Sequence, residues 1–179
     1  LDNLGVGEGD LFLFFGWFRD FYSYKKADYH HIFGWLQVDQ VIKGTAEIKK
    51  FCEFYKILHP HACANDYRFK YNTLFVSNQK STLKCIDLDI KSHGLFAKTD
   101  NKLILTEPGR SRSNWYMPEK YFSPSLNPKL FETRLKWSTQ ESNRICCTGY
   151  GQEFVMDSLT NPSIKDWARD LFLNYKIIE

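Results

Sequence analysis

Two apolar stretches near the N-terminus decide the fold: Gly9-Asp10-Leu11-Phe12-Leu13-Phe14-Phe15-Gly16-Trp17-Phe18 and His31-Ile32-Phe33-Gly34-Trp35-Leu36-Gln37-Val38-Asp39-Gln40-Val41-Ile42. Each holds the tripeptide Phe-Gly-Trp in a run of aromatic and branched residues typical of strands. Glycine inside a strand marks a bulge or a close backbone approach. We therefore predict two strands, 11–18 and 31–42, that begin a small closed sheet. Trp17, at a strand end, is expected to face a ligand, and Trp35, in mid-strand, to lie in the core.

The sequence after these strands predicts two helices. Apolar residues with i, i+3, i+4, i+7 spacing predict an amphipathic helix over 46–58, which His59-Pro60 should end because the residue before proline disfavours helix. A second helix should follow Asn161-Pro162-Ser163 and run to Tyr175, with Ser163 and Asp166 arranged like a capping box.

Shorter extended segments lie between the two helices. They are expected at 73–77, 83–88, 94–98 and 103–106, followed by a long ordered loop over 107–128. Strands that do not alternate regularly with helices argue against a doubly wound parallel sheet. We predict an α+β fold, a small mixed β-barrel of about six strands with two flanking helices, in a single domain over 1–179.

Composition supports one globular domain and excludes several classes. The chain has 179 residues, 43% hydrophobic and 17% aromatic, which suits an aromatic-packed core or a stacking platform for a planar ligand. A net charge of +3 does not by itself predict nucleic-acid binding. The five cysteines lack CxxC spacing and no secretory segment is visible, so we expect a cytoplasmic protein without a disulfide framework. No run reaches the roughly 18 apolar residues of a membrane span, so no membrane association is expected.

Candidate reactive residues are few. His59, His61 and Cys63 are the best metal ligands by residue type, but a capped helix end with a structural histidine is the preferred interpretation, so no metal is expected. The glycines of Gly5-x-Gly7-x-Gly9 precede a strand instead of opening a helix, which fails the context of a dinucleotide-binding loop. We expect no cofactor, and no reaction can be read from these residues.

The segment from Arg110 to Tyr116 is the best candidate for ligand binding. Arg110 and Arg112 suit phosphate, and Trp115 could stack on a base. The alternative is a surface loop anchored by one buried tryptophan. Gln152, between the glycines of a second segment, could read a base edge, although a plain turn into a strand is the simpler explanation.

Sequence blocks across the chain resemble known families. A strand that begins Gly-Asp, followed by one with an aliphatic-Gly-x-aliphatic-x-Val pattern, is similar to PUA-like domains such as the ASCH, EVE and YTH modules. The closer resemblance is to the Nmad3 family (nucleotide modification associated domain 3). It is carried by 5–19, 31–38, His59-Pro60-His61, 110–118 and 151–157. The usual extent of that family implies that a native N-terminal segment is missing before Leu1.

The resemblance implies a DNA-modification-associated role. The first hypothesis is recognition of a modified nucleobase or nucleotide in a PUA-like pocket, with nucleic acid, foremost modified DNA, as the partner. A base would stack on Trp17 or Trp115, and Gln152 would contact the edge of that base. Phosphate would be bound by Arg19, Arg110 and Arg112. A second hypothesis is an enzyme acting on a modified base, with Glu153, Asp157 or His61 as acid or base. A third is a protein-binding accessory factor of a phage or bacterial defence system.

Overall fold

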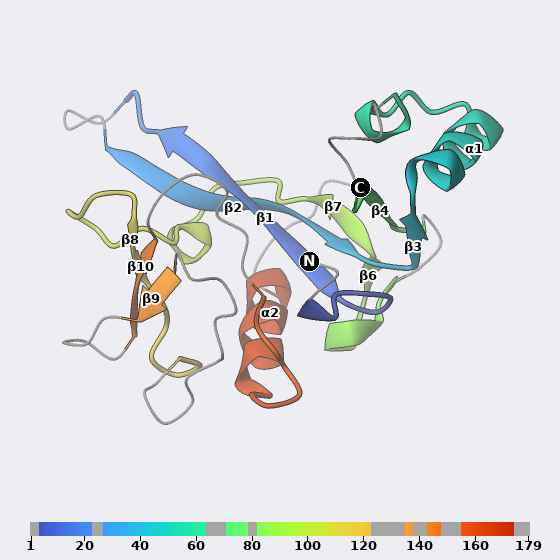
Figure 1. Cartoon of the computed structure of the whole chain (residues 1–179). Helices are drawn as coiled ribbons and strands as arrows, with labels where there is room; N and C mark the ends of the chain where they lie inside the picture. The colour runs from blue at the N-terminus through green and yellow to red at the C-terminus, as the bar shows by residue number, and fades with distance from the viewer. Residues whose placement is uncertain are drawn as a thin grey trace.

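The computed structural model describes residues 4–22, 27–63, 71–78, 82–122, 135–137, 143–147 and 155–173, with the backbone alone for 135–137 and Cys147. The fold contains helices α1 (Thr45–Tyr55) and α2 (Ser163–Leu173) and two long and several short strands, which are grouped in several sheets (Figure 1). The predicted α+β class with two helices is confirmed.

The first sheet has the strand order β1-β2-β7 and contains both Phe-Gly-Trp segments. β1 (Leu11–Arg19) pairs antiparallel with β2 (Asp28–Gln37), and β7 (His93–Leu95) pairs with the other edge of β2. Phe14 pairs with Gly34 but Phe15 pairs with Ile32, so Phe33 is an extra residue in a β-bulge. The predicted bulge near a glycine is confirmed in the second tripeptide.

The second predicted strand, 31–42, is in fact two strands. β2 ends at Gln37, and β3 covers Gln40–Lys43. Between them the backbone of Val38 bonds to the segment before β1: Val38 N–H donates to the Asp10 carbonyl, and Gly9 N–H donates to the Val38 carbonyl, both at 2.8 Å. Periodicity could not show this break, because the apolar pattern continues through it.

A series of pairings leads from β2 to a second sheet of order β8-β10-β9. His31 bridges to Ile104 and Thr106 bridges to Trp115, which lies in β8 (Asn114–Tyr116). β8 pairs with β10 (Arg144–Cys147), which pairs with β9 (Leu135–Trp137). The prediction of a loop over 107–128 was therefore wrong at β8. Pairings within the described part of the chain do not close these strands into a barrel.

Two smaller sheets contain the remaining strands of the described residues. β3 pairs with β4 (Thr73–Val76), and β5 (Thr82–Leu83) pairs with β6 (Leu88–Lys91). The predicted strand over 83–88 is interrupted by a 3₁₀ turn, Lys84–Ile86. Helix α1 ends before the predicted Leu58, because Lys56 adopts a left-handed conformation (φ 55°) and caps the helix with its backbone N–H.

Each helix covers a different apolar core. Trp167, Leu171 and Phe172 of α2 join the larger core with Ile32 and Trp35. Trp35 is 1% exposed, so its predicted core position is confirmed. Helix α1 instead contributes to a smaller cluster that lies against β3 and β4; its buried members are Ile42, Ile48 and Cys52.

The start of α2 uses a different cap from the predicted one. Asn161 Oδ1 accepts a hydrogen bond from Ser163 N–H at 3.2 Å. The Ser163 hydroxyl donates to the Tyr121 carbonyl at 2.7 Å. Asn161 therefore serves as the capping side chain, while Ser163 ties the helix to the segment that follows β8.

Candidate functional site

Three of the predicted ligand-binding residues meet at one end of the β1–β2 hairpin. Trp17 is 59% exposed, and the Arg112 guanidinium carbon lies 4.3 Å from the centre of its ring. The Arg19 guanidinium carbon lies 5.8 Å from the same centre. We call Trp17, Arg19, Arg112 and their neighbour Asp28 the Trp17 cluster. It offers a flat aromatic surface next to two cations.

Asp28 fixes Arg19 in this cluster. The carboxylate accepts two hydrogen bonds from the Arg19 guanidinium, at 2.6 Å from Nε and 3.0 Å from Nη2. Hydrogen bonding from Arg19 lowers the pKa of Asp28, opposed by desolvation and helped by the Trp17 indole and by the charges of Arg19 and Arg112. Asp28 is ionised and pairs with Arg19, whereas Arg112 lies over the indole. Asp28 lies between the two predicted strands, 11–18 and 31–42, and was therefore not among the predicted site residues. In the structure it is directly opposite Arg19 across the hairpin, and the opposite charges of the two residues are the signal that could have found it.

A buried hydrogen-bond network behind Trp17 holds Arg112 in place. His30, which pairs with Trp17 across the hairpin, donates its backbone N–H to Thr106 Oγ1 at 2.9 Å. The Thr106 hydroxyl donates to the Arg112 carbonyl at 3.1 Å. The indole N–H of Trp115 donates to His30 Nδ1 at 2.9 Å. The loop that carries Arg112 is thus tied to β2 at the residue that faces Trp17.

Trp115 belongs to this interior and not to a binding surface. Its side chain is 0% exposed and packs edge-on against Phe15, with ring centres 5.0 Å apart. A ligand cannot stack on Trp115 without opening the core. The structure therefore agrees with the alternative interpretation, a loop anchored by a buried tryptophan, for this residue.

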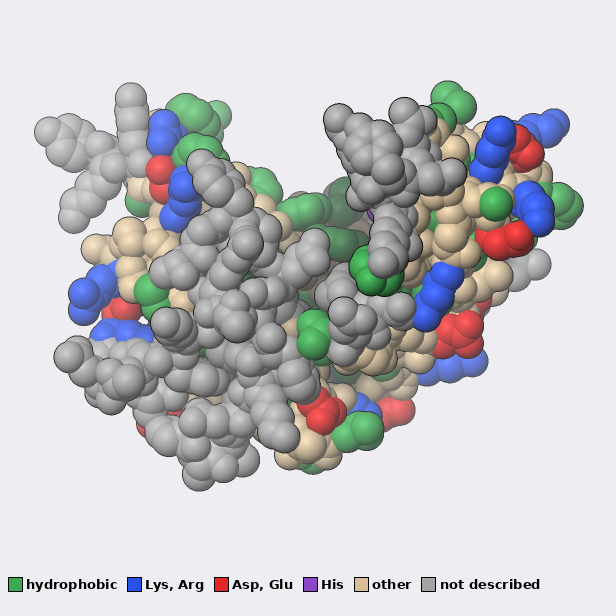
Figure 2. Space-filling model, in the orientation of Figure 1, with side chains coloured by type: hydrophobic (Ala, Val, Ile, Leu, Met, Phe, Trp, Pro, Cys, Tyr) green, Lys and Arg blue, Asp and Glu red, His purple; other side chains and the backbone are tan. Residues whose placement is uncertain are grey.

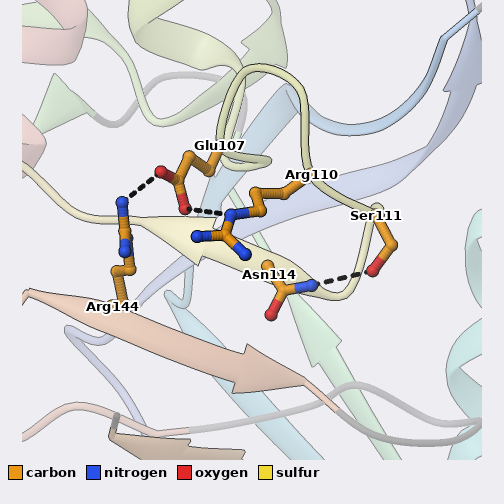
Figure 3. Close-up of polar contacts among 5 residues, drawn as sticks. All are labelled: Glu107, Arg110, Ser111, Asn114 and Arg144. Carbon is orange, nitrogen blue, oxygen red and sulfur yellow. Dashed lines mark hydrogen bonds and ion pairs between the residues drawn. The ribbon is translucent and has the colours of Figure 1, made fainter. Parts of the chain in front are cut away.

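Arg110 lies two residues from Arg112 but has a different partner. Its Nε is 3.8 Å from Glu107 Oε2, and the other oxygen of Glu107 accepts a hydrogen bond from Arg144 (Figure 3). The same figure shows Asn114 Nδ2 donating to Ser111 Oγ, a bond of 2.8 Å that closes the loop. Glu107 thus lies between Arg110 and Arg144 of β10 and pairs with both.

The candidate acid and base residues are not brought together by any contact of the described residues. Asp157 lies in the turn before α2, where its carboxylate accepts from Leu159 N–H at 2.8 Å. His61 lies in a 3₁₀ turn, Pro60–Ala62, that contacts α1. Figure 1 places α1 and α2 in different parts of the fold. Gln152 and Glu153 lie outside the described residues.

The candidate metal ligands also have local roles. His59 Nδ1 accepts a hydrogen bond from His61 N–H at 3.2 Å and so caps the 3₁₀ turn. Among the described residues, no three side chains of the metal-ligating types are close enough to hold an ion. His59 thus has a structural role, but it caps the start of the 3₁₀ turn, while Lys56 caps the end of α1.

Comparison with known proteins identifies one family. The model of Nmad3, nucleotide modification associated domain 3, matches residues 1–157. No curated protein and no solved structure matches the chain. Within the described residues, neither helix has the length and apolarity required to cross a membrane.

Proposed function

Because the chain belongs to the Nmad3 family, we propose that it recognises a modified nucleobase in a nucleic acid, with the Trp17 cluster as the contact surface. The observation that carries this proposal is the convergence of an exposed indole and two guanidinium groups from segments far apart in the sequence. The family description supports a role in nucleotide modification. We choose recognition over catalysis because the cluster consists mainly of an aromatic ring and guanidinium groups, which are suited to stacking on a base and binding phosphate.

The cluster suits nucleic acid for two reasons. An indole accepts a base by stacking, which is tolerant of sequence because every base has a flat face. Guanidinium groups bind phosphate oxygens through paired N–H donors. Asp28 neutralises Arg19 and holds it in one orientation, so Arg112 is the cation that we assign to the phosphate next to the stacked base.

The base would either insert between the Trp17 ring and the Arg112 side chain or stack on the exposed part of the indole. An extruded base has lost its stacking partners, and the indole replaces them. The guanidinium can stack on the new base as it does on Trp17, because both are flat aromatic rings. A modified base that pairs weakly in the duplex would be extruded at lower cost, which gives a physical basis for selectivity.

We further propose that the strands of this domain, 1–179, form a PUA-like barrel. The support is the hairpin of β1 and β2, where a Gly-Asp strand start is followed by Gly34 and Leu36 in the second strand. Trp17 lies near the end of that hairpin at which β1 connects to β2, and the Arg112 guanidinium lies over its ring.

Incubation of the protein with matched modified and unmodified oligonucleotides tests the proposal. Both equilibrium binding and the mass of the recovered oligonucleotide are measured. Selective binding with unchanged mass is the result we expect. A new product mass would replace recognition by catalysis, and the absence of both binding and product would contradict the proposal.

A further inference from the structure

A cavity of about 320 Å³ lies away from the Trp17 cluster, between α1, β4 and β7. Its apolar lining includes Phe51, Cys52 and Phe75, and its polar lining consists of His59, Ser77 and His93. Figure 2 shows a hollow on the face of the molecule in view, with hydrophobic side chains along it. The volume lies at the lower end of the range for small-molecule sites.

The hydrogen bonds around His93 fix which of its ring nitrogens carries the proton. The Ser92 hydroxyl donates to the Asn78 carbonyl at 2.8 Å, and a hydroxyl has a single proton to donate. In the 2.7 Å contact between Ser77 Oγ and Ser92 Oγ, Ser77 must therefore be the donor. Ser77 Oγ then accepts from His93 Nδ1, 3.0 Å away. The neutral His93 ring is protonated at Nδ1, and its Nε2 is a hydrogen-bond acceptor.

The neutral His59 ring is the opposite tautomer. Its Nδ1 accepts from His61 N–H at 3.2 Å, so in the neutral ring the proton lies on Nε2. One cavity is therefore lined by one imidazole whose Nε2 donates and one whose Nε2 accepts. The local backbone and the two serines set both forms before any ligand arrives, which is the preorganisation that a specific site requires.

From this lining we infer that the cavity binds the base of a neutral nucleoside, with His59 as donor and His93 as acceptor to its polar edge. Nucleobases present a donor and an acceptor side by side on a flat ring, and Phe51 and Phe75 supply aromatic surface for that ring. None of the described residues that line the cavity is Asp, Glu, Lys or Arg, so these side chains provide a neutral lining that suits an uncharged ring.

This site does not depend on the proposed function of the Trp17 cluster. Nucleic acid could bind at the cluster while the cavity takes no nucleoside, and the reverse is equally allowed. The two are measured with different probes, oligonucleotides for the cluster and free nucleosides for the cavity. Failure of one inference is therefore distinguishable from failure of the other.

The test is titration of the full chain with thymidine, deoxycytidine, deoxyadenosine, deoxyguanosine and a methylated deoxycytidine, by calorimetry. Deoxyribose and toluene are the control ligands, because deoxyribose lacks the aromatic base and toluene lacks the polar edge. The variants are His59→Asn and His93→Asn. Asparagine retains an acceptor for the His61 N–H or a donor to Ser77, but removes the Nε2 group. Leu58→Asn and Leu95→Asn are matched controls, since both side chains are exposed and neither lines the cavity.

We expect at least one nucleoside to bind more tightly than about 1 mM, and each histidine variant to weaken that binding about tenfold, the effect of one hydrogen bond. The control variants should bind as the unmodified protein does. The inference is overturned if no nucleoside binds, if toluene binds as well as the best nucleoside, or if both histidine variants keep full affinity.

Nitrogen-detected NMR of the imidazole rings keeps the inference testable even where a variant does not fold. In the unmodified protein, the neutral rings of His59 and His93 should be protonated on opposite nitrogens. Both Nε2 resonances should shift when the nucleoside is added. The same tautomer in both rings, or no shift on binding, would overturn the assignment of donor and acceptor.

Discussion

Arg112 lies over the face of Trp17, with its guanidinium carbon 4.3 Å from the ring centre. The two residues come from β1 and from the loop before β8, and the buried bonds of His30 and Thr106 hold these segments together. An exposed indole with an arginine over it supplies the two groups that we propose bind a base and its phosphate.

Trp17→Ala should weaken oligonucleotide binding by roughly tenfold or more, because stacking on an aromatic side chain contributes about 1–3 kcal/mol per base. The measurement is fluorescence anisotropy of a labelled oligonucleotide. Phe54→Ala is the matched control, since Phe54 is an aromatic residue of α1 that is 78% exposed. Equal losses in the two variants would mean that Trp17 contributes no more than any exposed ring.

Arg112→Ala should reduce the salt dependence of oligonucleotide binding. Each phosphate contact that is lost lowers the slope of log affinity against log salt by about 0.7 for a single strand and about 0.9 for a duplex. Arg110→Ala removes the same charge from the same loop but breaks only the ion pair with Glu107. Affinity measured from low to high salt should therefore change slope in the first variant and not in the second. A common change in both would point to net charge instead of a specific contact.

Gly94→Ala should destabilise the fold, because a Cβ atom at this position would lie 2.6 Å from Trp35 Cζ2 and 2.8 Å from Cη2. The indole is buried in the larger core and cannot move aside. Overpacking of this kind costs about 1–3 kcal/mol. Chemical denaturation of Gly94→Ala beside Gly7→Ala checks the prediction, since the nearest atom to a Cβ at Gly7 is 3.9 Å away. Equal unfolding free energies would show that the close approach has no energetic effect.

Stability should fall as the pH is lowered through the histidine range. Burial, with a smaller effect of the Arg112 charge, lowers the pKa of His30, and burial lowers the pKa of His31. The unfolded chain then binds protons near the ordinary value of about 6.5, where the folded chain does not, so the free energy of unfolding decreases from that pH downward. Above that value the contribution is fully present. Below the lowered pKa values of His30 and His31, this contribution to the free energy of unfolding is absent.

Protonation of His30 should destabilise the fold because Trp115 Nε1–H donates a hydrogen bond to His30 Nδ1. A protonated His30 has no acceptor to offer the indole N–H. Urea denaturation from about pH 7.5 to about pH 5 should show the decrease. His30→Gln, which keeps an acceptor but does not titrate, should reduce the slope. A flat profile for the unmodified protein would refute this account of His30 and His31.

Local patterns in the sequence predicted the elements whose neighbours are near in the chain. Strand β1, helix α1 and the position of α2 followed from composition and spacing, because each buries one face against its neighbours. The residue at which β2 ends could not be predicted from local sequence patterns. It is set by bonds from Val38 to Gly9 and Asp10, a contact across strands that no local pattern of the second stretch contains.

The candidate site was predicted in part for the same reason. Trp17, Arg19 and Arg112 were selected by residue type, and the fold brings them together. Trp115 and Arg110 fitted the same chemical argument equally well. Only the three-dimensional structure distinguishes them, since Trp115 is buried against Phe15 and Arg110 is paired with Glu107.

Recognition of a modified base by the Trp17 cluster is decided by the ratio of affinities for two oligonucleotides that differ only in one modified base. The wild-type protein should bind the modified oligonucleotide about tenfold more tightly or better. Trp17→Ala should lose most of this ratio, and Arg110→Ala should keep it. Equal affinities for the two oligonucleotides across a panel of base modifications would contradict recognition of a modified base by this cluster.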